Sequence, residues 1–372
     1  MNLREKISAF LLFVLACFTG LLPFAAPQAC AQALQEGLAL CSGPLMLSLA
    51  PFLVVSALLI RCPAGELLGL PFRPAVRLMG LGKCTACAAR VLLIGFLGGF
   101  APAAHAAAQA VQTGQLTAEQ ADTLLPACVC SGPSFVILTV GQHLLGSREL
   151  GACLFAAQVL AGYLSAAVLA RLCPCKGRSG TEKNTPAAPV RLDRIVADST
   201  MTYLKLCGFV LYFRMLATGL GAVFPPGAAL LGAILLEVCS GCDLASRTGL
   251  WGSTLCCAAL SLQGLSVLLQ VRTICPPEMT LRPLFRARVL HLPLSLAFFS
   301  LLVPAGERMT AAFSQEKVII LRRIPPDCAF LVFVVCCLAA AQLTNLLAQC
   351  SACSGTLKKE ASCGILSPRS ND

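Results

Sequence analysis

Long apolar runs alternate with short polar connectors along most of the chain. A helix rises 1.5 Å per residue, so about 20 apolar residues cross the hydrocarbon core of a bilayer. Runs of roughly this length occupy residues 7–26, 38–60, 84–100, 150–172, 203–224, 250–271, 289–304 and 329–348. This pattern predicts an all-α polytopic membrane protein with eight full spans.

Two shorter apolar segments interrupt the series. One opens with Cys130-Ser131-Gly132-Pro133 and runs to Leu145, and the other ends in Glu237-Val-Cys-Ser-Gly241. Irregular backbone at membrane depth persists only where protein or a watery cavity shelters its polar groups. Transporters hold solutes at such breaks. We therefore predict two re-entrant or broken segments, one in each of two similar halves, and a further break at Gly98 and Gly99.

The connectors divide the chain into six predicted parts: an N-terminal anchor at 1–36, a first membrane half at 37–172, a cytoplasmic basic linker at 173–202, a second membrane half at 203–304, a connector with the final span at 305–350, and a cytoplasmic tail at 351–372. The sequence Ala31-Gln32-Ala33 also fits a signal-peptide cleavage site. Because another span follows at once, we favour an uncleaved anchor. Between the segments, Gly114 predicts a helix stop, and Thr117 with Gln120 predicts the capping box of a short helix.

Charge sets the expected orientation. The 28 Lys and Arg residues exceed the 17 acids, which gives a net charge of +11. The basic residues form clusters between apolar runs rather than one stripe, which argues against nucleic acid as a partner. The positive-inside rule places both termini and the connectors 61–83, 171–198 and 272–288 in the cytoplasm of a multi-pass cell-membrane protein. The segment 103–127 has no Lys or Arg, so we expect it on the outer face.

Composition narrows the function classes. Hydrophobic residues make up 57% of the chain and charged residues 12%, so the lipid bilayer is the first partner. The 23 cysteines are odd in number and many lie inside apolar runs, where they serve as small apolar fillers. A metal site would need about four converging ligands, so we expect no metal and no other cofactor. No Walker loop, His-Glu-x-x-His or Gly-x-Ser-x-Gly motif is present, and we expect no enzyme.

Polar residues inside the apolar runs are the candidate site. A carboxylate such as Glu237 is costly there unless it faces a watery cavity or pairs with a cation, Arg214 or Lys205. Ser131 stands at a half-helix start, where the helix dipole favours anionic groups, although simple capping would explain it equally. Gln263 and Gln270 are seven residues apart, so we expect them on one helix face, where they read a solute or bond between helices. We expect Glu237 and Ser131 to line one cavity.

Several motifs in a fixed order resemble a known family. They are Gly98-Gly99-Phe100-Ala101, Gly114-Gln-Leu116-Thr117-Ala-Glu119-Gln120-Ala121, Cys130-Ser131-Gly132-Pro133, Leu236-Glu237 with Gly241, Gly264-Leu265-Ser266 with Gln270, and Ala287-Arg288 with His291. Together they are similar to sporulation integral membrane proteins of the YlbJ type, in the nucleoside-recognition or Gate superfamily. The likeness covers roughly residues 37–304. Several polar positions of the family are replaced here, for example by Phe100, Cys130 and Cys239.

The resemblance implies a role in spore maturation and the recognition or passage of a small solute such as a nucleoside. The residues expected to bind it are Gly98, Gly99, Ser131, Gly132, Pro133, Glu237, Gly241, Gln263 and Gln270. Two alternatives stay open: a small-molecule permease unconnected with sporulation, and a non-transporting membrane scaffold for envelope assembly. Association of the chain with itself as a homo-oligomer also stays open.

Overall fold

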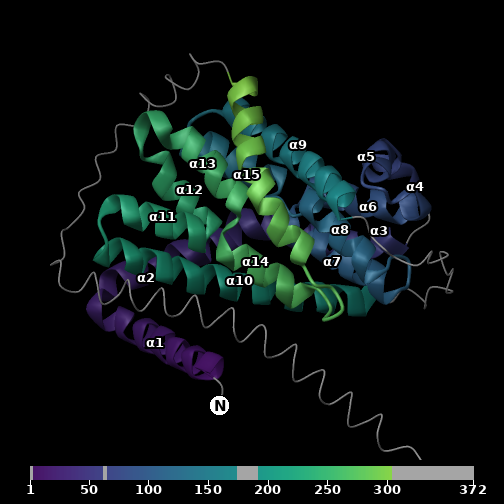
Figure 1. The fold of residues 1–372 in the computed structure, drawn as a ribbon. Coiled ribbons are helices and arrows are strands. Elements are labelled where there is room, and N and C mark those ends of the chain that lie inside the picture. The colour runs from purple at the N-terminus through teal and green to yellow at the C-terminus, as the bar shows by residue number, and fades with distance from the viewer. Residues whose placement is uncertain (1–2, 62–64, 174–191, 304–372) are drawn as a thin grey trace, which may run out of the picture. The chain divides into compact units, whose positions relative to one another are not determined.

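The computed structural model describes residues 3–61, 65–173 and 192–303, and every regular element in these ranges is helical (Figure 1). The all-α prediction is confirmed. The predicted span at 329–348, the tail at 351–372 and most of the basic linker lie outside the described residues. Cα packing separates two compact units: α1 (Leu3–Ala25) belongs to one, and the elements from Gln32 onwards form the other apart from the turn Ala222–Pro225. The second unit is described below.

Four helical stretches in the described ranges are long and apolar enough to cross a membrane: Arg148–Leu172, Leu192–Val223, Gly249–Ile274 and Arg282–Leu302. A fifth results if the bent pair Phe13–Ala25 and Pro27–Gly43 counts as one span. The helices therefore fit a membrane protein. Length and composition alone support four or five spans here, not eight.

One long helical rod opens the unit. It consists of α2 (Pro27–Leu40) from Gln32 onwards, the π-helical η1 (Cys41–Leu45) and α3 (Met46–Arg61). The short elements α4 (Gly65–Leu68), η2 (Leu70–Phe72), α5 (Arg73–Leu78) and η3 (Gly82–Cys84) follow. The helix α10 (Leu192–Val223) runs antiparallel to the rod, because Leu206 packs near Leu49 while Arg214 bonds to Glu36.

The helices α6 (Thr85–Gly98) and α7 (Phe100–Gln112) form a hairpin that reverses at Gly99, where φ is +81°. Arg90 in α6 donates hydrogen bonds to the Leu59 carbonyl (3.4 Å) and to Oε1 of Gln115 (3.1 Å) just beyond α7. At Gln115 the chain has thus returned to the end of the unit at which α6 begins. The segment 84–100, predicted to be a full crossing, therefore forms a short helix and a reversal, because a glycine that can break a helix can equally reverse the chain.

The next helices form one broken rod. The helix α8 (Ala118–Cys128) begins with the predicted capping box: Oγ1 of Thr117 accepts from the Gln120 amide (3.2 Å), and Oε1 of Gln120 accepts from the Thr117 amide (2.9 Å). This prediction is confirmed. After irregular backbone at 129–133, the π-helical η4 (Ser134–Leu144) continues away from α8.

The helix α9 (Arg148–Leu172) runs back along both parts of this broken rod. Gly162 of α9 lies against the Ala127 backbone near the end of α8, and Gly151 lies against Gly141 in η4. Because one straight helix follows both parts, the segment from Ser131 to Leu145 continues through the unit. We expected it to be re-entrant, whereas in this half the chain reverses at the hairpin α6–α7.

The same order of elements occurs again after α10. The helices α11 (Pro226–Leu236) and α12 (Val238–Ser246) form a second hairpin that turns at Glu237 (Figure 1). Beyond η5 (Gly249–Trp251), α13 (Gly252–Leu262) and α14 (Gly264–Ile274) form a rod broken at Gln263, and α15 (Arg282–Leu302) returns along α13. Hairpin, broken rod and straight helix therefore occur twice.

Two connectors that we expected on opposite sides meet. Asp122 in α8 accepts hydrogen bonds from the amide and the hydroxyl of Thr280 (both 2.8 Å) and from the Leu281 amide (3.2 Å). Thr280 belongs to the connector 272–288, whereas Asp122 belongs to the segment 103–127. Both segments reach one end of the unit, so the prediction of opposite sides is wrong.

Small side chains allow the helices of the hairpins to pack closely. Along α7, Ala101, Ala103, Ala104, Ala106, Ala107 and Ala110 are fully buried. Small residues at helix contacts let backbones approach each other, which is the usual basis of helix packing in membranes. Close backbone contact through small residues therefore complements the large buried side chains of the core, such as Leu92, Leu124 and Phe299.

Candidate functional site

Each hairpin tip packs directly on the break of a rod. A Cβ atom added at Gly99 would lie 2.6 Å from the Gly132 nitrogen, and one added at Gly264 would lie 2.9 Å from the Glu237 nitrogen. Both glycines also have positive φ. No other residue meets both demands without strain, so glycine is required at these two crossings.

A small buried cavity lies beside these crossings. Its volume is about 40 Å³, which accommodates water molecules. Its lining includes Gly98, Ser131, Gly132, Glu237 and Gln270 of the predicted site, together with Cys41, Tyr203, Cys207, Cys239 and apolar residues. Glu237 and Ser131 thus line one cavity, as the sequence led us to expect. Gly99, Pro133, Gly241 and Gln263 do not line it.

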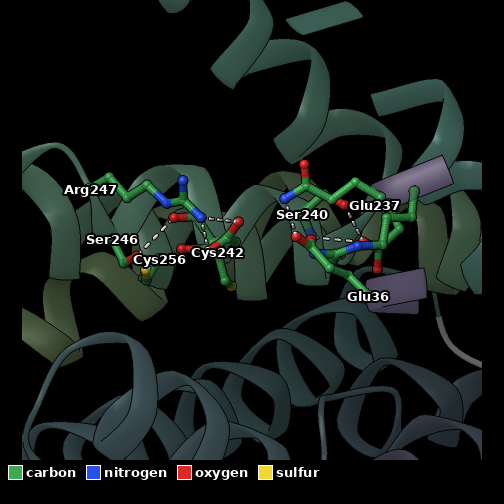
Figure 2. Close-up of polar contacts among 10 residues, drawn as sticks. Glu36, Glu237, Ser240, Cys242, Ser246, Arg247 and Cys256 are labelled. Atoms are coloured by element: carbon green, nitrogen blue, oxygen red, sulfur yellow. Dashed lines mark hydrogen bonds and ion pairs between the residues drawn. The ribbon is translucent and has the colours of Figure 1, made fainter. Parts of the chain in front are cut away.

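Glu237 caps the helix that follows it. Its side chain is 1% exposed, and its carboxylate accepts hydrogen bonds from the Cys239 amide (2.8 Å), the Ser240 amide (2.7 Å) and the Ser240 hydroxyl (2.8 Å) (Figure 2). Anionic groups are stabilised at a helix start by these amides and by the helix dipole. The cap holds the hairpin tip in a defined shape.

The expected partner of Glu237 is engaged elsewhere. Nη2 of Arg214 pairs with Oε2 of Glu36 in α2 at 2.6 Å. Glu237 has no ion pair with any described residue, so the alternative of a pair with Arg214 or Lys205 is wrong. Three hydrogen bonds from its own segment satisfy the buried charge instead.

The two glutamines do not act as a pair. Gln263 ends α13 in the left-handed conformation (φ +65°), while Gln270 lies within α14. The break between them removes the common helix face that we predicted. Nε2 of Gln263 donates to the Leu260 carbonyl (2.9 Å) and approaches the Ser131 hydroxyl at 3.5 Å, and Nε2 of Gln270 donates to the Ser266 hydroxyl (3.0 Å). Gln263 therefore supports Ser131 from behind, and only Gln270 faces the cavity.

Arg288 joins the two broken rods, which sequence reasoning did not foresee. Its guanidinium donates to the Val129 carbonyl (2.7 Å) at the end of α8 and to the Ser261 carbonyl (3.0 Å) near the end of α13. Cations stabilise the carbonyl groups at helix C-termini. We had counted Arg288 in a cytoplasmic connector, yet it is 7% exposed. Its family-like spacing to His291 was the signal in the sequence.

Further buried polar groups extend this contact. Nε2 of Gln158 in α9 donates to the Cys257 carbonyl and the Ser261 hydroxyl (both 3.2 Å), and Ser261 bonds to Ser295 in α15. Nε2 of His291 lies 3.1 Å from the Gln158 carbonyl. Because all five side chains are buried, this network fixes the relative positions of α9, α13 and α15.

The cysteines among the described residues are free thiols, and most of them are buried. In this part of the chain no group of three or more His, Cys, Asp and Glu residues could hold a metal. Comparison with known protein families, curated proteins and solved structures gave no match to the chain.

Proposed function

We propose that the chain is a multi-pass membrane protein that recognises or passes a small polar solute at the cavity between the breaks. One observation carries this proposal: two hairpin tips, two broken rods and a buried carboxylate converge at one cavity. Such convergence of broken helices is typical of transporters with inverted repeats. The two hairpins here enter the unit from opposite ends. The hairpin α6–α7 starts near α5, whereas the hairpin α11–α12 ends at Ser246, which contacts Gly252 at the start of α13.

The proposed topology follows from the basic end. Arg77 of α5, Arg171 of α9 and Arg282 of α15 share one end of the unit with Asp122, and we assign this end to the cytoplasm. In this topology the rod α8–η4 crosses the membrane in place of the segment 84–100. The number of spans is therefore unchanged. The full proposal keeps eight spans, including 7–26 and 329–348, with both termini in the cytoplasm.

The present conformation is a closed one in this proposal. A cavity of about 40 Å³ is far smaller than the pockets of several hundred Å³ that hold drug-sized ligands. A nucleoside would enter only after a hairpin tip moves away from its rod. Because Ser240 donates two of the three hydrogen bonds to Glu237, a solute that bonds to this carboxylate would compete with the helix cap.

Uptake of radiolabelled uridine into proteoliposomes tests the proposal. We expect Glu237→Gln to abolish uptake, because the amide keeps the shape but loses the charge and one acceptor. Asp243→Asn is the matched control, since Asp243 lies in the same helix and pairs only with Arg247 (2.8 Å) at the partly exposed end. Equal uptake by wild-type and Glu237→Gln protein would contradict the proposal.

A non-transporting scaffold is the second candidate. Two observations favour it: the Glu237 carboxylate is already satisfied within its own helix, and the cavity is small. A scaffold predicts no solute uptake above protein-free liposomes and the same envelope phenotype for wild-type and Glu237→Gln protein. The link to sporulation rests on the sequence resemblance alone and stays a prediction.

A further inference from the structure

A second cavity, of about 590 Å³, lies at the basic end of the unit and shares no lining residue with the central site. It is lined by Pro74, Arg77, Leu78, Met79, Gly80, Ala170 and Arg171. It therefore lies between α5 with its following turn and the last turn of α9. Most of its lining residues are exposed, so the cavity opens to the surface.

Two cations face this cavity without an acidic partner. Arg77 and Arg171 are exposed, and neither side chain makes an ion pair or a hydrogen bond with any described residue. Arg73, one helical turn before Arg77, adds a third charge on the same side of α5. Its Nε atom is buried without a hydrogen-bond partner among the described residues. Positive charge is thus concentrated where no carboxylate of a described residue pairs with it.

Exposed leucines lie on α4, η2 and α5, which follow one another in contact, and at the end of α9. Leu67, Leu68, Leu70, Leu78 and Leu172 are between 41% and 71% exposed. In water such a group of leucines would be unfavourable, whereas at a membrane interface they would contact acyl chains. Arginines beside them would lie at the level of the headgroups, as basic pockets between helices at the cytoplasmic face do.

We infer that this cavity binds the phosphate headgroup of an anionic phospholipid. Arg77 and Arg171 would hold the phosphodiester from two sides, with guanidinium geometry suited to two oxygens. Met79 and Ala170 would form the apolar floor, and Leu78 and Leu172 would contact the acyl chains. The inference rests on the proposed membrane topology, in which this end faces the cytoplasm.

Binding of phosphatidylglycerol to the full chain in neutral detergent tests the inference. We expect phosphatidylglycerol to raise the melting temperature more than phosphatidylcholine does. The double variant Arg77→Gln/Arg171→Gln should bind it about 30-fold more weakly, the loss typical of two basic residues at an anionic surface. Arg194→Gln/Arg282→Gln is the matched control, because both arginines are exposed and lie outside the cavity, and it should bind like the wild type.

Three outcomes would overturn the inference: equal affinity in the two double variants, equal effects of the two lipids, or an equal effect of inorganic phosphate, which would make the cavity a site for free anions. Extraction of membranes with alkaline carbonate separates this inference from the topology. If carbonate removes the chain, the proposed membrane placement fails. If the chain stays inserted and shows no preference for phosphatidylglycerol, only the lipid site fails.

Discussion

At the scale of single residues, backbone conformation matters more than side-chain chemistry. Gly99 and Gly264 sit at the crossings because their neighbours leave no room for a Cβ atom. Gly80 has a similar positive φ of +75°, but nothing lies within 4 Å of a Cβ atom added there. A comparison of the two positions therefore distinguishes the cost of the left-handed conformation from the cost of a clash with neighbouring backbone.

We expect Gly99→Ala to destabilise the fold more than Gly80→Ala. The control substitution costs about 1–2 kcal/mol of left-handed strain. At Gly99 the new methyl group must also displace the backbone of Gly132, so the free energy of unfolding should fall by several kcal/mol. Thermal unfolding in detergent measures both. Equal losses would show that the tip does not need the close contact.

A cysteine beside the membrane segments offers a chemical test of burial. Burial raises the pKa of the Cys275 thiol to about 12, and the nearby Asp122 carboxylate adds to this effect. The thiol therefore stays protonated through pH 9, and its contribution to stability is present below that pH and lost as the pH rises towards 12. The neutral thiol is a poor nucleophile.

We accordingly expect maleimide at pH 8 to label the exposed Cys173 rapidly and Cys275 slowly in the folded protein. Both should react at similar rates after unfolding in detergent at high temperature. Mass spectrometry of tryptic peptides measures the two rates. Rapid labelling of Cys275 in the folded chain would contradict its burial.

At the scale of elements, Arg288 decides how the two broken rods meet. It satisfies one carbonyl at the end of α8 and one near the end of α13. Each of these buried carbonyl groups would lose a charged donor if the arginine were removed, and a buried unsatisfied acceptor costs about 1–3 kcal/mol.

We expect Arg288→Ala to lower the free energy of unfolding by about 2 kcal/mol or more. Arg286→Ala is the control, because Arg286 is exposed and has only a weak contact with the Cys173 sulfur at 3.7 Å. Arg288→Lys should retain part of the stability, since one ammonium group cannot reach both carbonyls in the same geometry. If Arg288→Ala lowered the free energy of unfolding no more than Arg286→Ala does, Arg288 would not join the two rods.

At the scale of the whole molecule, the position of the connector 103–127 distinguishes the two topologies. The sequence pattern placed it opposite the connector 272–288, whereas Asp122 bonds to Thr280. We expect cysteines introduced at the exposed positions Gln112 and Glu278 to react with an impermeant maleimide from the same side of the membrane, and a cysteine at Glu149 from the other side. Labelling above the background of the native cysteines, in intact cells and in inverted vesicles, measures this. Reaction of the first two from opposite sides would restore the original topology.

The sequence by itself determined the helical class, the apolar runs, the capping box at Thr117 and the breaks near Gly99, Ser131 and Glu237. These features follow from local chemistry, namely the length of an apolar run, the hydrogen bonds of a cap and the freedom of glycine. The sequence also predicted that Ser131 and Glu237 line one cavity, because both residues lie at breaks. It did not show the break at Gln263, which it placed inside one span.

Only the tertiary structure decided what each break does. Gly99 reverses the chain while the backbone at Ser131 continues it, and both conformations are open to the same local sequence. The partner of Arg214 and the burial of Arg288 depend on residues distant along the chain. Such choices follow from which backbones pack closely together, and an apolar pattern carries no information about that because lipid and protein interior are equally apolar.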